Sequence, residues 1–284
     1  MIELPPYSLF SAACQRGLSV ARPLTDFARE RDPLGFNFGA GWPPSYAAFG
    51  RMRSLATLEM VLSLKPKRVL EVAAGDASLC ACLAAKGVEV FANDLRAESL
   101  REAVSCFSVG NQINLLPGNL FDLDPAENGL FDLVIACEII EHVAHTVDLL
   151  RHLRRFLTPG GHLLLTTPNG SYFRNRLPTY SESEDPRCLE AWQFKPDADG
   201  HLFLLTSAEL RDVARQAGFL VEQVDLFATP FITGHCRLSM LHGRSVARLC
   251  YRLEQLSQHL SSKTREKLCF LMFALLVPDI SAGS

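Results

Sequence analysis

A short segment, residues 137–143 with the sequence CEIIEHV, concentrates side chains that can do chemistry. It directly follows residues 131–136, an apolar run typical of a buried strand. If a helical turn begins at this point, Glu138, Glu141 and His142 share one face, because they stand at positions i, i+3 and i+4. Two carboxylates and an imidazole so placed could bind one divalent cation. Oxygen ligands favour Mg²⁺, whereas the histidine leaves Zn²⁺ or Mn²⁺ open.

Two other interpretations of this segment stay open. A lone His142 can act as the general base that deprotonates a hydroxyl nucleophile. The segment can also shape a substrate pocket without any metal. Turnover in a chelator, followed by restoration of Mg²⁺ or Zn²⁺, distinguishes the metal interpretation from the other two.

A second polar group belongs to the first two predicted strands. The first strand, residues 68–72, contains Glu71 near its end and leads into a turn with a single glycine, Gly75. A diphosphate needs close backbone approach from several glycines and a positive environment, so a carboxylate there would repel it. Glu71 instead suits a ligand with an ammonium group, such as the methionine moiety of S-adenosyl-L-methionine. Asp94 lies 19 residues after Gly75, where a carboxylate can accept hydrogen bonds from both hydroxyls of a ribose.

Taken in order, five segments resemble the motifs of class I (Rossmann-like) S-adenosylmethionine-dependent methyltransferases across residues 65–227. The resemblance implies that the backbone near Gly75, including Ala73, faces the methionine end of the cofactor. It also implies that Leu95 packs on the adenine and that Asn119 and Leu120 contact the adenine edge. We further expect Cys137, at the end of the fourth strand, to line the cofactor site. The five segments are Glu71-Val72-Ala73-Ala74-Gly75, Asp94, Gly118-Asn119-Leu120, Phe131-Asp132-Leu133-Val134 and Leu157-Thr158-Pro159-Gly160-Gly161.

The glycine pattern of this family is interrupted here. Ala73 and Ala77 occupy the outer positions of the usual Gly-x-Gly-x-Gly turn, and Asn119 stands where an aspartate is common. A Cβ is tolerable at the two alanines only if their backbone keeps negative φ angles. We therefore expect a retained cofactor site. The alternative is weak cofactor binding, or a non-catalytic nucleotide-binding protein.

The segment after the fourth predicted strand resembles two particular families of methyltransferases. Glu138-x-x-Glu141-His142, with Thr167-Pro168-Asn169 downstream, is similar to ubiquinone-biosynthesis O-methyltransferases. The first stretch is also similar to small-RNA 3′-terminal 2′-O-methyltransferases, in which a further histidine comes from downstream and His201 is the counterpart here. Both resemblances imply a metal that contacts substrate hydroxyls. We expect methyl transfer to a small-molecule hydroxyl with Glu138, Glu141, His142 and His201 as the catalytic residues; a metal-dependent RNA 2′-O-methyltransferase is the alternative.

These groups need a scaffold, and the chain alternates short apolar runs with amphipathic segments. That order predicts an α/β fold, a three-layer sandwich whose seven-stranded sheet is mostly parallel with an antiparallel last strand. A capping box at residues 206–209 opens a helix, and the polar stretch up to about Gly200 is a candidate lid. The predicted domains are an N-terminal cap (1–50), a methyltransferase core (51–227), a helical insert (228–267) and the last core strand with a tail (268–284).

The composition and charge of the chain limit the kinds of molecule that it is expected to bind. The 284 residues carry a formal net charge of −3, which disfavours nucleic acid as a partner. Residues 228–267 hold seven basic and two acidic side chains, so recognition of an acidic substrate, or peripheral membrane contact through residues 236–267, is an alternative to simple solvation. No secretory signal and no run of roughly 20 apolar residues occurs, so we expect a cytoplasmic enzyme without a transmembrane segment. The oligomeric state stays open.

Overall fold

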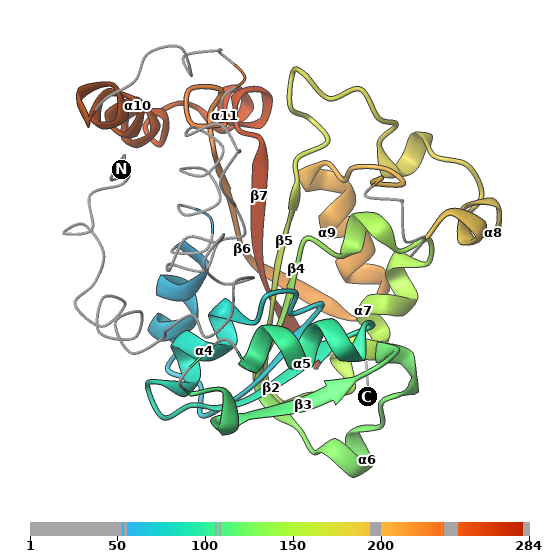
Figure 1. Ribbon diagram of the computed structural model, residues 1–284. Helices are drawn as coiled ribbons and strands as arrows, with labels where there is room; N and C mark the ends of the chain where they lie inside the picture. Colours follow the sequence, from blue (N-terminus) through green and yellow to red (C-terminus); the bar gives the residue numbers. More distant parts are fainter. Residues whose placement is uncertain are drawn as a thin grey trace. The chain divides into compact units, whose positions relative to one another are not determined.

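The computed structural model describes residues 53, 56–105, 107, 109–193, 200–233, 235 and 244–280. Within these ranges seven strands follow the order β3-β2-β1-β4-β5-β7-β6 in one sheet (Figure 1). Strand β7 runs antiparallel to both of its neighbours, β5 and β6, whereas the pairs β1–β2, β2–β3 and β4–β5 are parallel. The predicted α/β class, a mostly parallel seven-stranded sheet with an antiparallel last strand, is therefore confirmed. The strands are β1 (Arg68–Val72), β2 (Glu89–Asp94), β3 (Ile113–Pro117), β4 (Phe131–Cys137), β5 (Leu157–Pro168), β6 (Phe219–Phe227) and β7 (Leu271–Pro278).

Helices connect and flank these strands. The expected N-terminal cap over residues 1–50 lies outside the described residues, as do residues 236–243 of the expected helical insert. No helix in the described ranges is both long and apolar enough to cross a bilayer. The α-helices are α4 (Ser78–Ala84), α5 (Ala97–Ser105), α6 (Pro125–Asn128), α7 (Thr146–Arg154), α8 (Pro186–Leu189), α9 (Ser207–Gln216), α10 (Arg244–Ser257) and α11 (Ser262–Leu268). The 3₁₀ turns are η2 (Gly110–Gln112), η3 (Leu120–Asp122), η4 (Ile140–His142), η5 (Tyr180–Glu182) and η6 (Glu190–Trp192).

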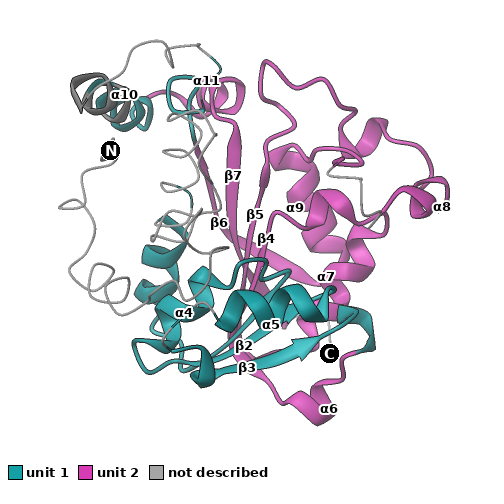
Figure 2. Ribbon diagram, in the orientation of Figure 1, with its two compact units in different colours: residues 1–122, 228–259 teal, residues 123–227, 260–284 magenta. Residues whose placement is uncertain are grey.

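The chain divides into two compact units, which are coloured separately in Figure 2. Unit 1 comprises Met1–Asp122 and Ala228–His259. Its strands β1, β2 and β3 pair in parallel, with Val90 of β2 in register with Val69 on one side and Ile113 on the other. Val69 and Val90 are fully buried because helices cover such parallel strands on both faces.

Unit 2 comprises Leu123–Phe227 and Leu260–Ser284. Here β5 is parallel to β4 and antiparallel to β7, and three consecutive leucines, 163–165, are fully buried in its centre. The end of β5 is anchored by Asn169, whose buried amide donates to the carbonyl oxygens of Glu266 (2.7 Å) and Cys269 (2.8 Å). This anchor holds the strand end that carries Thr166 and Thr167 in place.

The predicted capping box at the start of α9 is confirmed. The backbone N–H of Thr206 donates to Oε2 of Glu209 at 2.7 Å, and the N–H of Glu209 donates back to the Thr206 hydroxyl at 3.2 Å. These reciprocal bonds satisfy backbone donors that a helix N-terminus leaves open. The local sequence alone is sufficient for such a feature, because all its partners lie within four residues.

Candidate cofactor site and acceptor site

The turn after β1 takes an unusual backbone path. Ala73, Gly75 and Ala77 have φ angles of 52°, 54° and 55°, so the expectation that the two alanines keep negative φ is wrong. The reason lies in the hydrogen bonds of the turn. The Ala74 N–H donates to the Asn93 carbonyl at 2.9 Å, and the Ala77 N–H donates to the Ala74 carbonyl at 2.8 Å. These bonds impose left-handed geometry at positions where glycine is the favoured residue.

Replacing Ala73 by glycine is expected to stabilise the protein. The left-handed conformation costs a residue with a Cβ roughly 1–2 kcal/mol, and the greater unfolded-state freedom of glycine offsets about 0.4–1 kcal/mol of that gain. Ala73 is exposed, so its methyl group contributes little packing. We expect a net gain of about 0.5–1 kcal/mol, or about 1–4 °C in Tm by calorimetry. Ala74→Gly is the matched control: Ala74 is buried and lacks a positive φ, so this change should lower Tm, and a fall in Tm for Ala73→Gly would contradict the expectation.

Glu71 is buried beneath the turn, and its Oε2 accepts a hydrogen bond from the Cys80 thiol at 2.8 Å. Burial raises the pKa of Glu71 to about 8, with smaller contributions in the same direction from Asp76 and Asp94; the Cys80 hydrogen bond opposes the rise. At neutral pH the carboxyl group is therefore mostly protonated unless a cation lies beside it. From the sequence we expect a fixed negative charge at Glu71, whereas in the structure this charge depends on a cationic ligand beside the buried carboxyl group.

Asp94 ties the turn after β1 to the end of β2. Its Oδ2 accepts the Gly75 N–H at 3.1 Å, and its Oδ1 accepts the Arg96 N–H at 3.1 Å. An ionised carboxylate has about four acceptor positions, so capacity remains for two ribose hydroxyls. Leu95 follows immediately and is 51% exposed, which leaves an apolar side chain available for a flat aromatic ligand.

Asn93 is a site residue that the sequence reasoning missed. Its buried amide donates to the carbonyl oxygens of Leu116 (2.6 Å) and Gly118 (3.0 Å), and so fixes the loop after β3 to the end of β2. That loop carries Asn119, whose Oδ1 accepts the Phe121 N–H at 3.1 Å, and the buried Leu120. The amide of Asn93 directly after the apolar residues 90–92 of β2 is the signal that was available. Its partners lie more than 20 residues away and could not be read from it.

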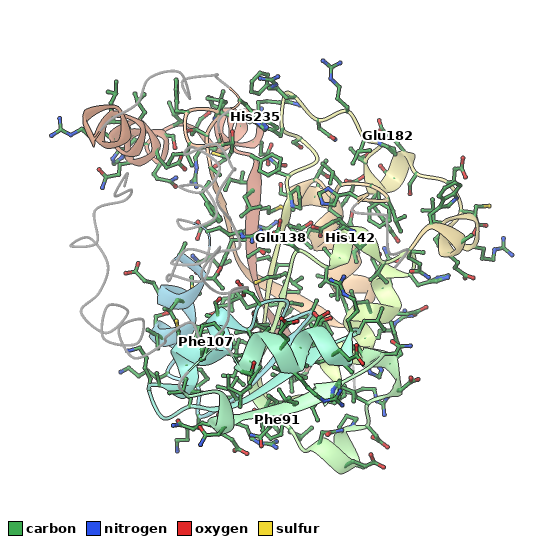
Figure 3. The ribbon with its side chains drawn as sticks, in the orientation of Figure 1. Phe91, Phe107, Glu138, His142, Glu182 and His235 are labelled. Atoms are coloured by element: carbon green, nitrogen blue, oxygen red, sulfur yellow. The ribbon has the colours of Figure 1, made fainter. Side chains whose placement is uncertain are left out.

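The segment after β4 differs from the predicted helical turn. Cys137 ends β4, half-buried and in register with Thr166. Glu138 then takes a φ of 52°, and only residues 140–142 form a 3₁₀ turn. Glu138 and His142, both labelled in Figure 3, therefore do not share a helical face, and the helical spacing argument is wrong. Glu138 instead pairs with Thr166, whose hydroxyl donates to Oε1 at 2.8 Å and whose carbonyl accepts the Glu138 N–H at 2.8 Å.

Glu141 is held by the next residue of β5. It is fully buried, and its Oε2 accepts a hydrogen bond from the Thr167 hydroxyl at 2.9 Å. Successive side chains of a strand point to opposite faces, so Thr166 and Thr167 hold Glu138 and Glu141 on opposite sides. This is the physical reason why Glu138 does not join Glu141 and His142 in one group.

The structure brings Glu141, His142 and His201 together. One ligand atom from each lies within 4.8 Å of the other two, and this is a possible metal-binding group among the described residues. The Glu141 Oε1 is 3.8 Å from Nε2 of His201, and the two imidazole rings meet edge to face at 4.8 Å. Zn–N bonds of about 2.0–2.1 Å place ligand atoms roughly 3.4 Å apart, so the three side chains would have to draw closer to coordinate such an ion.

His201 reaches this group through a backbone contact. The N–H of Leu202 donates to the carbonyl of Glu141 at 2.9 Å, which places the chain at residues 201–202 beside η4. Burial lowers the pKa of His201 to about 4, and the neighbouring His142 acts in the same direction. The imidazole is therefore neutral at physiological pH and has a lone pair to offer to a cation or to a donor.

Part of the expected lid is ordered and attached beside this group. Oε1 of Gln193 accepts the Ala144 N–H at 3.0 Å, and the Glu190 carboxylate lies 2.6 Å from Nε2 of His145. These contacts hold α8 and η6 against the residues that follow His142. Residues 194–199 lie outside the described ranges.

Comparison with solved structures defines the class of fold. CcbJ methyltransferase from Streptomyces caelestis superimposes with a TM-score of 0.54 and 18% identity, covering 84% of this chain and all of that chain. A putative sarcosine dimethylglycine methyltransferase from Galdieria sulphuraria gives a TM-score of 0.52 at 14% identity, over 81% of this chain and 87% of that chain. At such identities the likeness shows the fold alone: the Rossmann-like fold of S-adenosylmethionine-dependent methyltransferases.

The sequence comparison then names the family. Residues 47–224 match the model of the methyltransferase domain family, which is more than half of the chain, and the protein belongs to that family. Ubiquinone biosynthesis O-methyltransferases are similar over a shorter part. The protein of Xanthomonas oryzae pv. oryzae (strain PXO99A) is 34% identical over 109 residues, and that of Vibrio parahaemolyticus is 28% identical over 113 residues. These matches cover 38% and 39% of this chain, which spans about half the length of these relatives (46% and 48%).

Proposed function

We propose that this protein transfers the methyl group of S-adenosyl-L-methionine to a hydroxyl oxygen of a small molecule. The observation that carries the proposal is the Asp94 carboxylate, bonded to the Gly75 N–H at the end of two parallel strands with the buried Glu71 close by in sequence. A relative in fold, a phosphoethanolamine N-methyltransferase from Haemonchus contortus (TM-score 0.50, 16% identity), is known in complex with S-adenosyl-L-methionine. The choice of oxygen as the acceptor atom follows the name of the similar proteins, which are ubiquinone biosynthesis O-methyltransferases.

The residues of unit 1 fit this cofactor. Glu71 gains a cationic partner in the cofactor's ammonium group, which offsets the cost of ionising a buried carboxyl. Asp94 has acceptor capacity for the ribose, and the exposed Leu95 and the buried Leu120 offer apolar contact to the adenine. The bound cofactor supplies a methyl group on a sulfonium, which is already a good leaving group. The main remaining task of the protein is to align and deprotonate the acceptor.

Glu141, His142 and His201 in unit 2 are the groups we assign to the acceptor. A metal-dependent form of the reaction is a specific second candidate, because these three residues bring ligand atoms within 4.8 Å of one another. A Mg²⁺, Zn²⁺ or Mn²⁺ ion bound there would act as a Lewis acid toward the acceptor hydroxyl. Without a cation, His142 would accept the hydroxyl proton as a general base. Glu138 is held by Thr166 and is not a member of this group.

Calorimetry tests the cofactor assignment. We expect S-adenosylmethionine and S-adenosylhomocysteine to bind with micromolar dissociation constants and NAD to give no measurable heat. The physical reason is that the turn has one glycine and a carboxylate, which suit an amino-acid moiety rather than a diphosphate. Tight NAD binding without S-adenosylmethionine binding would overturn the assignment.

Chelation tests the second candidate. With a panel of phenolic and quinone-precursor acceptors, turnover is followed as release of S-adenosylhomocysteine. If the cation is required, EDTA should reduce turnover by at least about 100-fold, the typical cost of losing one electrostatic stabiliser of the transition state, and Mg²⁺, Mn²⁺ or Zn²⁺ should restore it. Undiminished turnover in EDTA would leave His142 as the base and remove the metal.

A further inference from the structure

Glu141 carries two different contacts on its two carboxylate oxygens. Oε2 accepts the Thr167 hydroxyl at 2.9 Å, and Oε1 lies 3.8 Å from Nε2 of His201. The side chain is fully buried, and within unit 2 its backbone carbonyl accepts the Leu202 N–H. One oxygen is therefore engaged by a neutral donor while the other faces the histidine.

We propose that Thr167 is a positioning residue that presents Glu141 Oε1 to a divalent cation held together with His142 and His201. The inference rests on the metal-dependent form of the proposed function and deepens it. The Thr167 hydroxyl bonds to Oε2, the oxygen that is not the one 3.8 Å from His201, and so restricts rotation of the carboxylate. A hydrogen bond from an outer residue to a ligating carboxylate orients it, and losing such a partner typically costs 10–100-fold in metal affinity.

The backbone at Thr167 is fixed independently of its hydroxyl. Thr167 pairs in register with Met272 of β7, and the neighbouring Asn169 is anchored by two amide hydrogen bonds. A change confined to the hydroxyl therefore leaves the strand in place. The preceding residue, Thr166, bonds the other carboxylate, Glu138, so the two threonines divide the two carboxylates between them.

The chain provides a matched control at Thr146. This residue is also fully buried, at the start of α7, and its hydroxyl has no hydrogen-bond partner among the described residues. Thr146→Val thus makes the same chemical change without removing a contact to Glu141. We expect it to leave cation affinity unchanged.

The experiment is calorimetric titration of the full chain with Zn²⁺ and with Mn²⁺. His142→Ala and His201→Ala locate the bound ion, each with a large loss of affinity. Thr167→Val is expected to weaken binding at least about tenfold, and Thr167→Ser, which keeps the hydroxyl, to stay within about threefold of the wild type. If Thr167→Val is unstable, Thr167→Ala gives the same comparison, and S-adenosylhomocysteine affinity in each sample checks that the fold is intact.

Any result other than the expected loss in Thr167→Val with retention in Thr167→Ser contradicts the inference. Equal cation affinity in Thr167→Val and the wild type would overturn it and leave the cation site standing. Equal losses in Thr167→Val and Thr167→Ser would show that the side-chain volume matters and the hydrogen bond does not. No cation binding by the wild type would remove the inference and the cation site together. The methyltransferase proposal is judged separately, by S-adenosylhomocysteine binding in the same samples.

Discussion

Asp94→Ala is expected to lower the affinity for S-adenosylhomocysteine at least about 100-fold, since each hydrogen bond to a charged group contributes roughly 1.5–3 kcal/mol and two ribose hydroxyls lose their acceptor. The change also releases the Gly75 and Arg96 N–H groups that the carboxylate now holds at 3.1 Å, so the turn after β1 keeps only the Ala74–Asn93 backbone hydrogen bond as its described link to the end of β2. Calorimetric titration with S-adenosylhomocysteine measures the effect directly.

A control for Asp94→Ala removes a carboxylate elsewhere. Asp148→Ala is suitable because Asp148 is exposed on α7 and pairs with Arg151 one turn away, at 3.1 Å. We expect this variant to bind S-adenosylhomocysteine like the wild type. Binding by Asp94→Ala within threefold of the wild type would contradict the assignment of Asp94 to the ribose.

Glu71→Gln is expected to stabilise the empty protein while weakening its cofactor binding. The pKa of Glu71 rises from an ordinary 4.5 to about 8 on burial, so the folded state holds a proton that the unfolded state has released between these pH values. The wild-type free energy of unfolding therefore falls with rising pH across this window. Glutamine does not titrate, so the free energy of unfolding of the Glu71→Gln variant lacks this pH dependence. The wild-type free energy of unfolding should therefore fall, relative to that of the variant, by up to about 1.4 kcal/mol per pH unit between about pH 4.5 and pH 8.

Urea denaturation at each pH unit from about 5 to about 9.5 measures this difference. The two stability curves should lie closest at pH 5, diverge as pH rises and run parallel above pH 8; curves that stay parallel from pH 5 to 8 would contradict it. Cofactor binding should change in the opposite sense, with affinity falling about tenfold when the charged partner of the ammonium group is lost. In the wild type, binding near pH 7 should release a proton from Glu71, visible as a dependence of the binding enthalpy on the buffer, and this dependence should diminish in Glu71→Gln.

Local patterns in the sequence were sufficient for the architecture. The apolar runs at residues 68–72 and 131–136, separated by amphipathic segments, predict strand and helix because burial on a sheet or on one helix face requires those periods. The capping box at residues 206–209 follows from partners within one turn. Asp94 was found because parallel strands end at one edge of a sheet, so a carboxylate at a strand end has a predictable place.

The grouping of the polar side chains in the site depends on hydrogen-bond partners that are distant along the chain, so only the tertiary structure shows it. Thr166 and Thr167 separate Glu138 from Glu141, across 28 and 26 residues, and so break the helical grouping that spacing suggested. His201 joins Glu141 through the Leu202 backbone contact, where the sequence offered only a resemblance.

The burial of Glu71 and the backbone geometry of Ala73 also depend on contacts between segments that are distant along the chain. The charge of Glu71 depends on how much solvent the fold removes around it, and the positive φ of Ala73 depends on the hydrogen bond between Ala74 and Asn93. Residue types and spacing therefore determined which groups are present and which elements carry them. Only packing between distant segments determined which groups meet, because hydrogen-bond geometry and desolvation are properties of the folded arrangement and not of the local chain.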